Sequence, residues 1–244
     1  MEFTFDTHDL AGMTHEDAGD VIESADYVLP TGSTEQHSIH LPLFVDSLRA
    51  AALSERLANQ AHAHGLELAV LPTLPYGESE HHMQFPGTIT LAPDTYQDVI
   101  VDIGSSISRH GADRFLVLNC HGGNRRPISL AMDRLGREHD INAHFVHWTD
   151  YAREYLQDEF GDDWGHAGDH ETSVIELFYP DLVKESRKEP QKTTNGAQTR
   201  SYRYFDELTE QGGLGDPTAS DPQAVDEIVD KATNEILEAL AEDR

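Results

Sequence analysis

Acidic and imidazole side chains lie close together in the segment around residues 35–46. Glu35 and His37 are separated by one residue, so in an extended segment both side chains leave on the same side. Asp46 follows at the start of a predicted helix, and its two carboxylate oxygens can serve two metal ions. With His121, these are ligands that Zn, Mn or Fe take in hydrolytic sites. A pair of such ions activates water and polarises a carbonyl oxygen, as amide hydrolysis requires.

Other interpretations of individual residues stay open. His37 and His121 could be hydrogen-bonded loop histidines without a metal. Cys120 could act as a nucleophile, although its position at a buried strand end favours inert packing. Ser33 and Ser173 lack the Gly-x-Ser-x-Gly pattern of a serine hydrolase, so that mechanism is not predicted.

Short apolar runs alternate with segments whose apolar residues recur at helical spacing. The runs predict strands over residues 25–30, 66–71, 114–119 and 141–148. The periodic segments predict helices over 44–64, 93–110, 124–139, 172–178 and 221–242, with loops over 72–87, 150–165 and 184–213. This alternation is typical of a parallel sheet with helices on both faces. Since no internal repeat or clear linker is visible, we expect a single domain over residues 1–244.

The candidate residues follow the predicted strands. In a parallel sheet, the loops that leave the carboxyl ends of the strands meet at one edge, where ligands bind. We therefore expect the acids and histidines of four loops to face one another there. They are Glu35, His37, His40, Asp46, Glu78, Glu80, His81, His82, His121, His166, Asp169, His170 and Glu171.

The charge of the chain bears on its environment and partners. It has 45 acidic against 17 basic residues, a formal charge of −28, which disfavours nucleic acid and membrane partners. Because the acids are spread along the chain, we expect adaptation to high salt, with an ordinary acidic protein as the alternative. The chain start lacks a basic and apolar leader, no apolar run reaches about 18 residues, and Cys120 is a single cysteine. We therefore expect a cytoplasmic protein.

Five motifs together resemble the creatininase (creatinine amidohydrolase) family. The resemblance covers about residues 30 to 175 and implies a three-layer α/β/α fold with a mostly parallel central sheet. It also implies two divalent metal ions per subunit (Zn, Mn or Fe), hydrolysis of a cyclic or formyl amide C–N bond in a small-molecule substrate, and a homo-oligomer. The motifs are Gly32-Ser-Thr-Glu-Gln-His37, His40-Leu-Pro-Leu43 with Asp46, Phe85-Pro-Gly-Thr88, Asn119-Cys-His-Gly-Gly-Asn124, and His166-Ala-Gly168 with Glu171-Thr-Ser173.

The resemblance assigns roles to residues that match the family motifs. Glu35, His37, Asp46 and His121 match the metal-ligand positions, with Asp46 as the bridge between the ions. His166 matches the position of a catalytic histidine near the substrate.

One position departs from the creatinine-hydrolysing members, which carry a further acidic ligand where this chain has Gly123. Glu171 is similar to the carboxylate that completes the site in members with a Gly-Gly-Asn loop. That form is more similar to formamidopyrimidine-ribotide deformylases and to peptidases that mature a redox peptide. A substrate phosphate could be met by Arg125 and Arg126, which could equally be helix surface.

The expected mechanism is attack of metal-activated water on the substrate carbonyl. His166 would stabilise the oxyanion, and His166 or Asp169 would give a proton to the leaving nitrogen, with Glu171 in the same catalytic group. A non-catalytic metal-binding protein, a one-metal enzyme and a peptidase-type member stay open as alternatives. Trp148 and Trp164 could stack on a flat substrate or could pack in the core. The expected substrate contacts are His82, Asn124 and Trp148.

Overall fold

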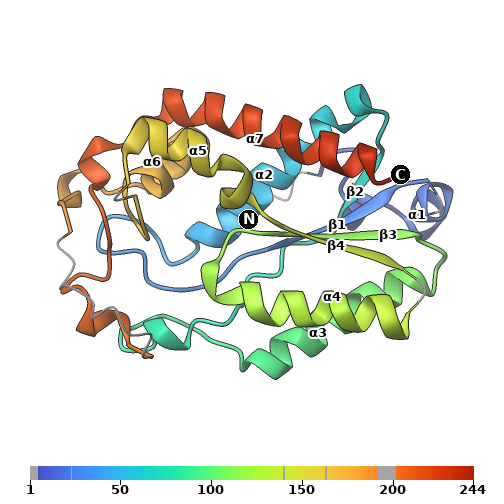
Figure 1. Cartoon of the computed structure of the whole chain (residues 1–244), viewed down its shortest axis with the longest axis horizontal. Coiled ribbons are helices and arrows are strands. Elements are labelled where there is room, and N and C mark those ends of the chain that lie inside the picture. The colour runs from blue at the N-terminus through green and yellow to red at the C-terminus, as the bar shows by residue number, and fades with distance from the viewer. Residues whose placement is uncertain (1–4, 23, 140, 163, 192–201) are drawn as a thin grey trace.

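The structure is a computed structural model that describes residues 5–22, 24–139, 141–162, 164–191 and 202–244. Four parallel strands form its central sheet in the order β2-β1-β3-β4 (Figure 1). Thr31 pairs with Asn119, and Asn119 pairs with His147, so three strands end at the same level. The strands are β1 (Asp26–Thr31), β2 (Leu68–Val70), β3 (Arg114–Asn119) and β4 (Asn142–His147).

Helices cover both faces of the sheet, so the expected three-layer α/β/α fold is confirmed (Figure 1). Helices α3 (Pro93–Ser108) and α4 (Arg125–Glu138) pack against one face. The other face is covered by α2 (Val45–Ala61), α5 (Trp148–Phe160), α6 (Asp169–Phe178) and α7 (Pro222–Glu242). Short 3-10 turns lie at Leu10–Gly12, His62–His64, Glu80–His82, Gly122–Asn124, Pro180–Leu182, Glu185–Arg187, Phe205–Glu207 and Pro217–Ala219.

Side-chain alternation in the strands separates two hydrophobic cores. Leu116 and Leu118 of β3 face the layer of α2, α5, α6 and α7, whereas Phe115 and Val117 face α3 and α4. Both sets are buried, which explains why β3 is a continuous apolar run in the sequence.

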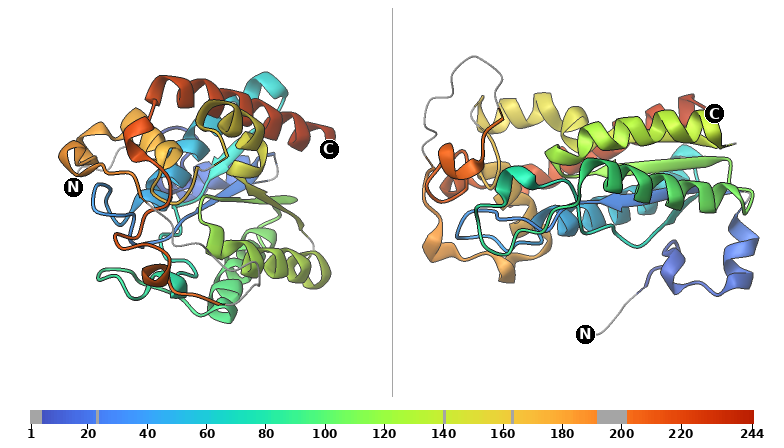
Figure 2. Two further views of the ribbon diagram at one scale, coloured as in Figure 1. Left: turned by 60° about the vertical axis from the view of Figure 1, so that its left-hand side comes forward. Right: turned by 90° about the horizontal axis from the view of Figure 1, so that it is seen from below.

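Two helices were not expected from the sequence. The predicted loop over 150–165 is wrong in its first part, because α5 extends from Trp148 to Phe160. Its apolar residues Ala152 and Leu156 lie one turn apart and pack in the core. Helix α1 (His15–Val21) lies beside the three layers (Figure 2), where Val21 packs against the core of α3 and α4. The predicted loop over 184–213 lies partly outside the described residues. None of the described helices is both long and apolar enough to cross a membrane.

The order of the strands opens a crevice at one end of the sheet. From β1 the chain crosses one face through α2 to reach β2, and from β2 it crosses the other face through α3 to reach β3. The loops after β1 and β3 therefore diverge at the switch point, which is the usual ligand site of such sheets. They gather at the end of the molecule away from the C-terminus (Figures 1 and 2).

Gly32 lets the end of β1 approach the beginning of α2. A Cβ atom at this position would lie 2.4 Å from the backbone nitrogen of Ser47 and 2.5 Å from the carbonyl carbon of Asp46. The absence of a side chain therefore places Asp46 next to the loop that carries Glu35 and His37.

We predict that Gly32→Ala lowers the free energy of unfolding by about 1–3 kcal/mol, because its Cβ would overpack backbone atoms. As a matched control, Gly136→Ala in α4 has no atom within 4 Å of the new Cβ and should raise stability by about 0.5–1 kcal/mol. Urea unfolding of both variants measures the difference. Equal effects of the two substitutions would contradict the close approach described above.

Candidate metal centre

Glu35 lies in the loop after β1 and is fully buried. Its Oε2 accepts a hydrogen bond of 2.6 Å from the hydroxyl of Ser79. Its Oε1 lies 3.3 Å from His121 Nδ1 and 3.3 Å from His82 Nε2. One oxygen is therefore held by the protein, while the other faces a group of imidazoles.

Asp46 lies between two histidines and presents one oxygen to each. Its Oδ1 is 3.4 Å from His37 Nε2, and its Oδ2 is 3.1 Å from His121 Nδ1. Asp46 is in the first turn of α2, where the helix dipole favours a carboxylate. Each oxygen of Asp46 therefore lies beside a different imidazole.

Backbone carbonyls fix the orientation of both histidines. His37 Nδ1 donates to the carbonyl of Glu35 at 3.1 Å, and His121 Nε2 donates to the carbonyl of Glu78 at 2.8 Å. The remaining nitrogens, Nε2 of His37 and Nδ1 of His121, face Asp46. A hydrogen bond at one ring nitrogen that leaves the other free is typical of metal-binding histidines.

Glu171, in the first turn of α6, completes the cluster from the other side. Its Oε2 accepts from the backbone nitrogen of Ala167 at 2.6 Å and lies 3.6 Å from His37 Nε2. Its Oε1 is paired with Arg49, which also contacts Asp46 Oδ1. Ala167 has a positive φ of 54°, a conformation that L-residues rarely adopt and that orients its N–H toward Glu171.

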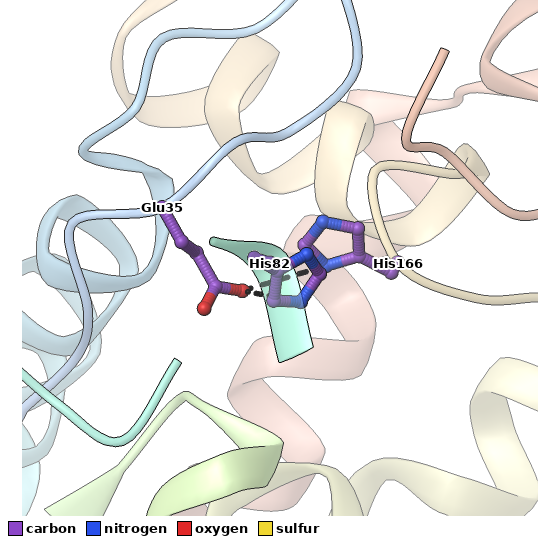
Figure 3. Close-up of side chains that lie close together, drawn as sticks. All are labelled: Glu35, His82 and His166. Carbon is purple, nitrogen blue, oxygen red and sulfur yellow. Dashed lines mark ion pairs between the residues drawn. The ribbon is translucent and has the colours of Figure 1, made fainter. Parts of the chain in front are cut away.

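His82 and His166 approach Glu35 from the same side (Figure 3). His166 Nδ1 lies 3.7 Å from Glu35 Oε1 and 3.9 Å from Glu171 Oε2. Its Nε2 donates to the carbonyl of Gln36 at 2.7 Å, so Nδ1 carries the lone pair. His82 Nδ1 accepts from the side-chain amide of Gln36 at 2.7 Å.

Three atoms that face the middle of this cluster are buried and form no hydrogen bond, although each lies within 3.4 Å of an oppositely charged or imidazole group of the cluster. Among the described residues, nothing forms a hydrogen bond with Glu35 Oε1, His37 Nε2 or Asp46 Oδ2. Leaving such groups unsatisfied costs about 1–3 kcal/mol each, and more for charged groups. The arrangement therefore fits divalent cations, which would satisfy all three atoms.

The buried groups shift one another's pKa strongly. Burial works to raise the pKa of Glu171, but Arg49 and His37 lower it to about 2. Burial works to lower the pKa of His37, but Asp46 outweighs it and raises the pKa to about 9. The pKa of His121 is raised well above its ordinary value, chiefly by Glu35, although burial works to lower it. The carboxylates thus stay ionised and attract positive charge.

Three predicted site residues lie elsewhere. The Asp169 carboxylate accepts from the backbone nitrogen of His170 at 2.7 Å and does not join the cluster. Asn124 binds the loops together, since its amide contacts the carbonyl of Gly32 and the backbone nitrogen of Glu78. Trp148 is 1% exposed and packs in the core.

Other candidate groups are also placed by the structure. Arg125 is paired with Asp150 at 2.6 Å, and Arg126 is exposed on α4, so neither faces the cluster. Cys120 is buried, and burial raises the pKa of its thiol to about 12, which argues against a nucleophile. His40 is buried with its Nε2 2.9 Å from the hydroxyl of Thr172.

Sequence reasoning missed several contributors. Arg49 follows Asp46 by one helical turn, and this spacing on an otherwise apolar helix face was the available signal. The segment after residue 202 also packs on the site. The ring centroids of Phe205 and His82 are 4.0 Å apart, and the Gly212 carbonyl accepts a hydrogen bond from the side-chain amide of Gln36. No local pattern marks this long-range contact.

A cavity of about 240 Å³ opens onto the cluster. Glu35, His121, His166 and Glu171 are among the residues that line it. Asn124 and Trp148 do not line it. The cluster is therefore reachable by a small ligand, in contrast to a structural metal site closed on all sides.

The sequence matches the family described as "Creatininase: Creatinine amidohydrolase" over residues 11–240. It is 31% identical over 207 residues to the mycofactocin precursor peptide peptidase of Mycobacterium tuberculosis (strain ATCC 25618 / H37Rv), covering 81% of this chain and 77% of that protein. It is 31% identical to the creatinine amidohydrolase of Pseudomonas putida, covering 68% and 67%. A solved structure described as "Creatininase Mn" superposes with a TM-score of 0.85 at 23% identity, covering 98% of this chain and 99% of that one.

We predict that the metal-free protein loses stability as pH rises from 6.5 to 9. A raised folded-state pKa means that protonated His37 stabilises the fold below its ordinary pKa of 6.5, and that this contribution is lost as pH rises through about 9. The expected loss is about 3 kcal/mol. Urea unfolding after chelation measures it. His37→Gln should flatten the profile, with a residual slope from His121; a profile that rises with pH in the unsubstituted protein would contradict the assignment.

Proposed function

The chain belongs to the creatininase (creatinine amidohydrolase) family, and on that premise we propose that it is a metal-dependent hydrolase of an amide C–N bond. The observation that carries this proposal is the convergence of three buried ligand atoms without hydrogen bonds beside an open cavity. A non-catalytic metal-binding protein would not need the cavity, nor His166 at its edge.

The cluster offers ligand atoms beside each oxygen of Asp46. Glu35, Asp46 and His121 form one group that could hold an ion. On the other side, Asp46 Oδ1 and Glu171 Oε2 lie 3.4 Å and 3.6 Å from His37 Nε2. His166 lies close enough to His37 and Glu171 to join that second group. Nitrogen and oxygen ligands of this kind suit Zn, Mn or Fe. Two such ions would polarise the amide carbonyl and lower the pKa of water toward neutrality.

His166 is proposed to move the proton. Burial and the neighbouring His37 lower the pKa of His166, which keeps the imidazole neutral at pH 7. Its Nε2–H is held by the carbonyl of Gln36, so the lone pair on Nδ1 faces the cluster. Nδ1 can therefore accept a proton from the attacking water and deliver it to the leaving nitrogen. Asp169 stays a weaker candidate because its carboxylate faces His170.

Gly123 supports assignment to the Gly-Gly-Asn type. A Cβ at this position would lie 2.0 Å from the carbonyl oxygen of Glu78, so no acidic side chain fits there without a backbone shift. Glu171 supplies the third carboxylate of the cluster in its place. We propose a small amide or formamide substrate, as in a formamidopyrimidine-ribotide deformylase or a creatinine amidohydrolase. A peptidase is the second candidate, because a mycofactocin precursor peptide peptidase is 31% identical over most of the chain.

Four further expectations stay predictions. They are that residues 1–244 act as one domain, that the protein is a homo-oligomer, that it is cytoplasmic, and that its acidic surface is an adaptation to high salt.

We predict that Asp46→Ala abolishes binding of both ions, because Asp46 presents one oxygen to each ligand group. Metal analysis after dialysis should give two ions per chain for the unsubstituted protein and fewer than one for the variant. Glu55→Gln, which removes an exposed acid from the same helix, is the control and should keep two. An Asp46→Ala protein that still holds two ions would refute the bridge.

Hydrolysis assays test the proposed reaction. The protein, loaded with Zn, Mn or Fe in molar KCl, should hydrolyse at least one of creatinine, a formamidopyrimidine nucleotide and a short peptide, and chelation should abolish the activity. His166→Gln should lower kcat by about 10²–10⁴-fold while retaining both ions. Turnover that survives chelation would contradict the proposal, and turnover of the peptide alone would favour the peptidase.

A further inference from the structure

The cavity beside the metal cluster has a second wall with a different chemistry. The wall is formed where β4 passes into α5 and by the start of α6, and its polar side chains are His147, Thr149 and His170. All three residues are more than nine-tenths buried. Three of the proposed metal ligands, Glu35, His121 and Glu171, line the same cavity, and Glu171 directly follows His170 in α6.

The protonation pattern of His147 follows from its neighbour Asn119. The Oδ1 of Asn119 receives hydrogen bonds from Thr31, from the backbone of His121 and from Asn124, which fixes the orientation of the amide. Its Nδ2 therefore donates to His147 Nδ1 at 2.8 Å. The proton of His147 must then be on Nε2, at the other edge of the ring, and within the described part of the chain this N–H has no acceptor.

Other donors reinforce this wall. His147 is the N-cap residue of α5 and makes no side-chain capping bond, so the N–H groups of the first turn stay available beside the hydroxyl of Thr149. His170 Nδ1 is buried without a hydrogen-bond partner. Arg49, which also lines the cavity, adds a positive charge. Two acids flank His170, since Asp169 Oδ1 lies 3.8 Å from its Nδ1 and Glu171 Oε1 lies 3.9 Å from its Nε2. Among the described residues, no acid forms an ion pair with His147, so His147 and Thr149 are the main donors of this wall.

From these observations we propose that the wall of His147, Thr149 and His170 binds a carboxylate of the substrate, while the amide bond lies at the metal cluster. Donors at a helix N-terminus favour an anion over a neutral group. A singly charged carboxylate fits better than a phosphate dianion, because Arg49 is the one lining cation of the described residues and is already paired with Asp46 and Glu171. The carboxylate belongs to a small acid amide or to the end of a peptide. This inference rests on the proposed function and narrows its substrate class to acids. It favours a small acid amide or a peptide end over creatinine, which has no carboxylate, and over a formamidopyrimidine nucleotide, which carries a phosphate.

Equilibrium binding to the zinc-loaded protein tests the proposal with matched pairs of probes. N-acetylglycine should bind at least tenfold more tightly than N-acetylglycinamide in calorimetry, with product analysis to show that the probes stay intact. A tripeptide with a free carboxyl end, compared with the same tripeptide amidated, forms the second pair. If N-acetylglycine binds more tightly than its amide, the substrate is a small acid. If only the tripeptide with a free carboxyl end binds more tightly than its amide, the substrate is the end of a peptide. Inorganic phosphate should bind more weakly than N-acetylglycine.

Variants separate this wall from the metal ions, which also attract carboxylates. Thr149→Val and His147→Phe should each reduce the preference for the acid about tenfold without changing the zinc content, whereas Arg126→Gln, which removes an exposed charge from α4, should leave it unchanged. If His147→Phe fails to fold, Thr149→Val alone decides. A preference that survives in both variants, or tighter binding of phosphate, would overturn the proposal.

Hydrolysis of amides without any acid preference would refute this inference alone, whereas acid binding without hydrolysis would refute the proposed function alone.

Discussion

Burial of three carboxylates at one sheet edge is the constraint on which the rest of the structure depends. Glu35, Asp46 and Glu171 are 0%, 1% and 7% exposed, and each would cost several kcal/mol to bury as an ion without compensation. Arg49 compensates part of this charge. The remaining oxygens and imidazole nitrogens converge without hydrogen-bond partners, so the site is electrostatically incomplete unless cations join it.

The fold supplies the positions that this charge arrangement needs. Strand β2 is added on one side of β1, and β3 and β4 are added on the other side. The loops that carry Glu35 and His121 therefore lie opposite each other. Gly32 brings the first turn of α2 against the end of β1, and Asp46 then reaches both histidines. Main-chain carbonyls orient the imidazoles, and the backbone N–H of Ala167 orients Glu171. The side chains are therefore held in place before any ion is bound.

Sequence reasoning found the parts of the site that depend on local pattern. The ends of β1 and β3 could be predicted because buried strands are continuous apolar runs, and His37 and His121 follow from their places beyond those ends. The role of Glu171 was predicted from the family resemblance, because no local pattern links it to His37 or Arg49, which lie more than a hundred positions earlier. The contacts of Arg49 and Phe205 and the extent of α5 could not be predicted from the sequence, because they depend on packing between distant segments. Most residues of α5 are polar or acidic, so its few buried apolar residues give only a weak helical pattern in the sequence.

The most direct test of the two-ion site is an anomalous diffraction map of crystals equilibrated with Mn²⁺. If two ions bind as proposed, the map should show two peaks, one beside each oxygen of the Asp46 carboxylate. One peak should contact Glu35 and His121, and the other His37 and Glu171. A single peak, or peaks that do not touch Asp46, would contradict the account.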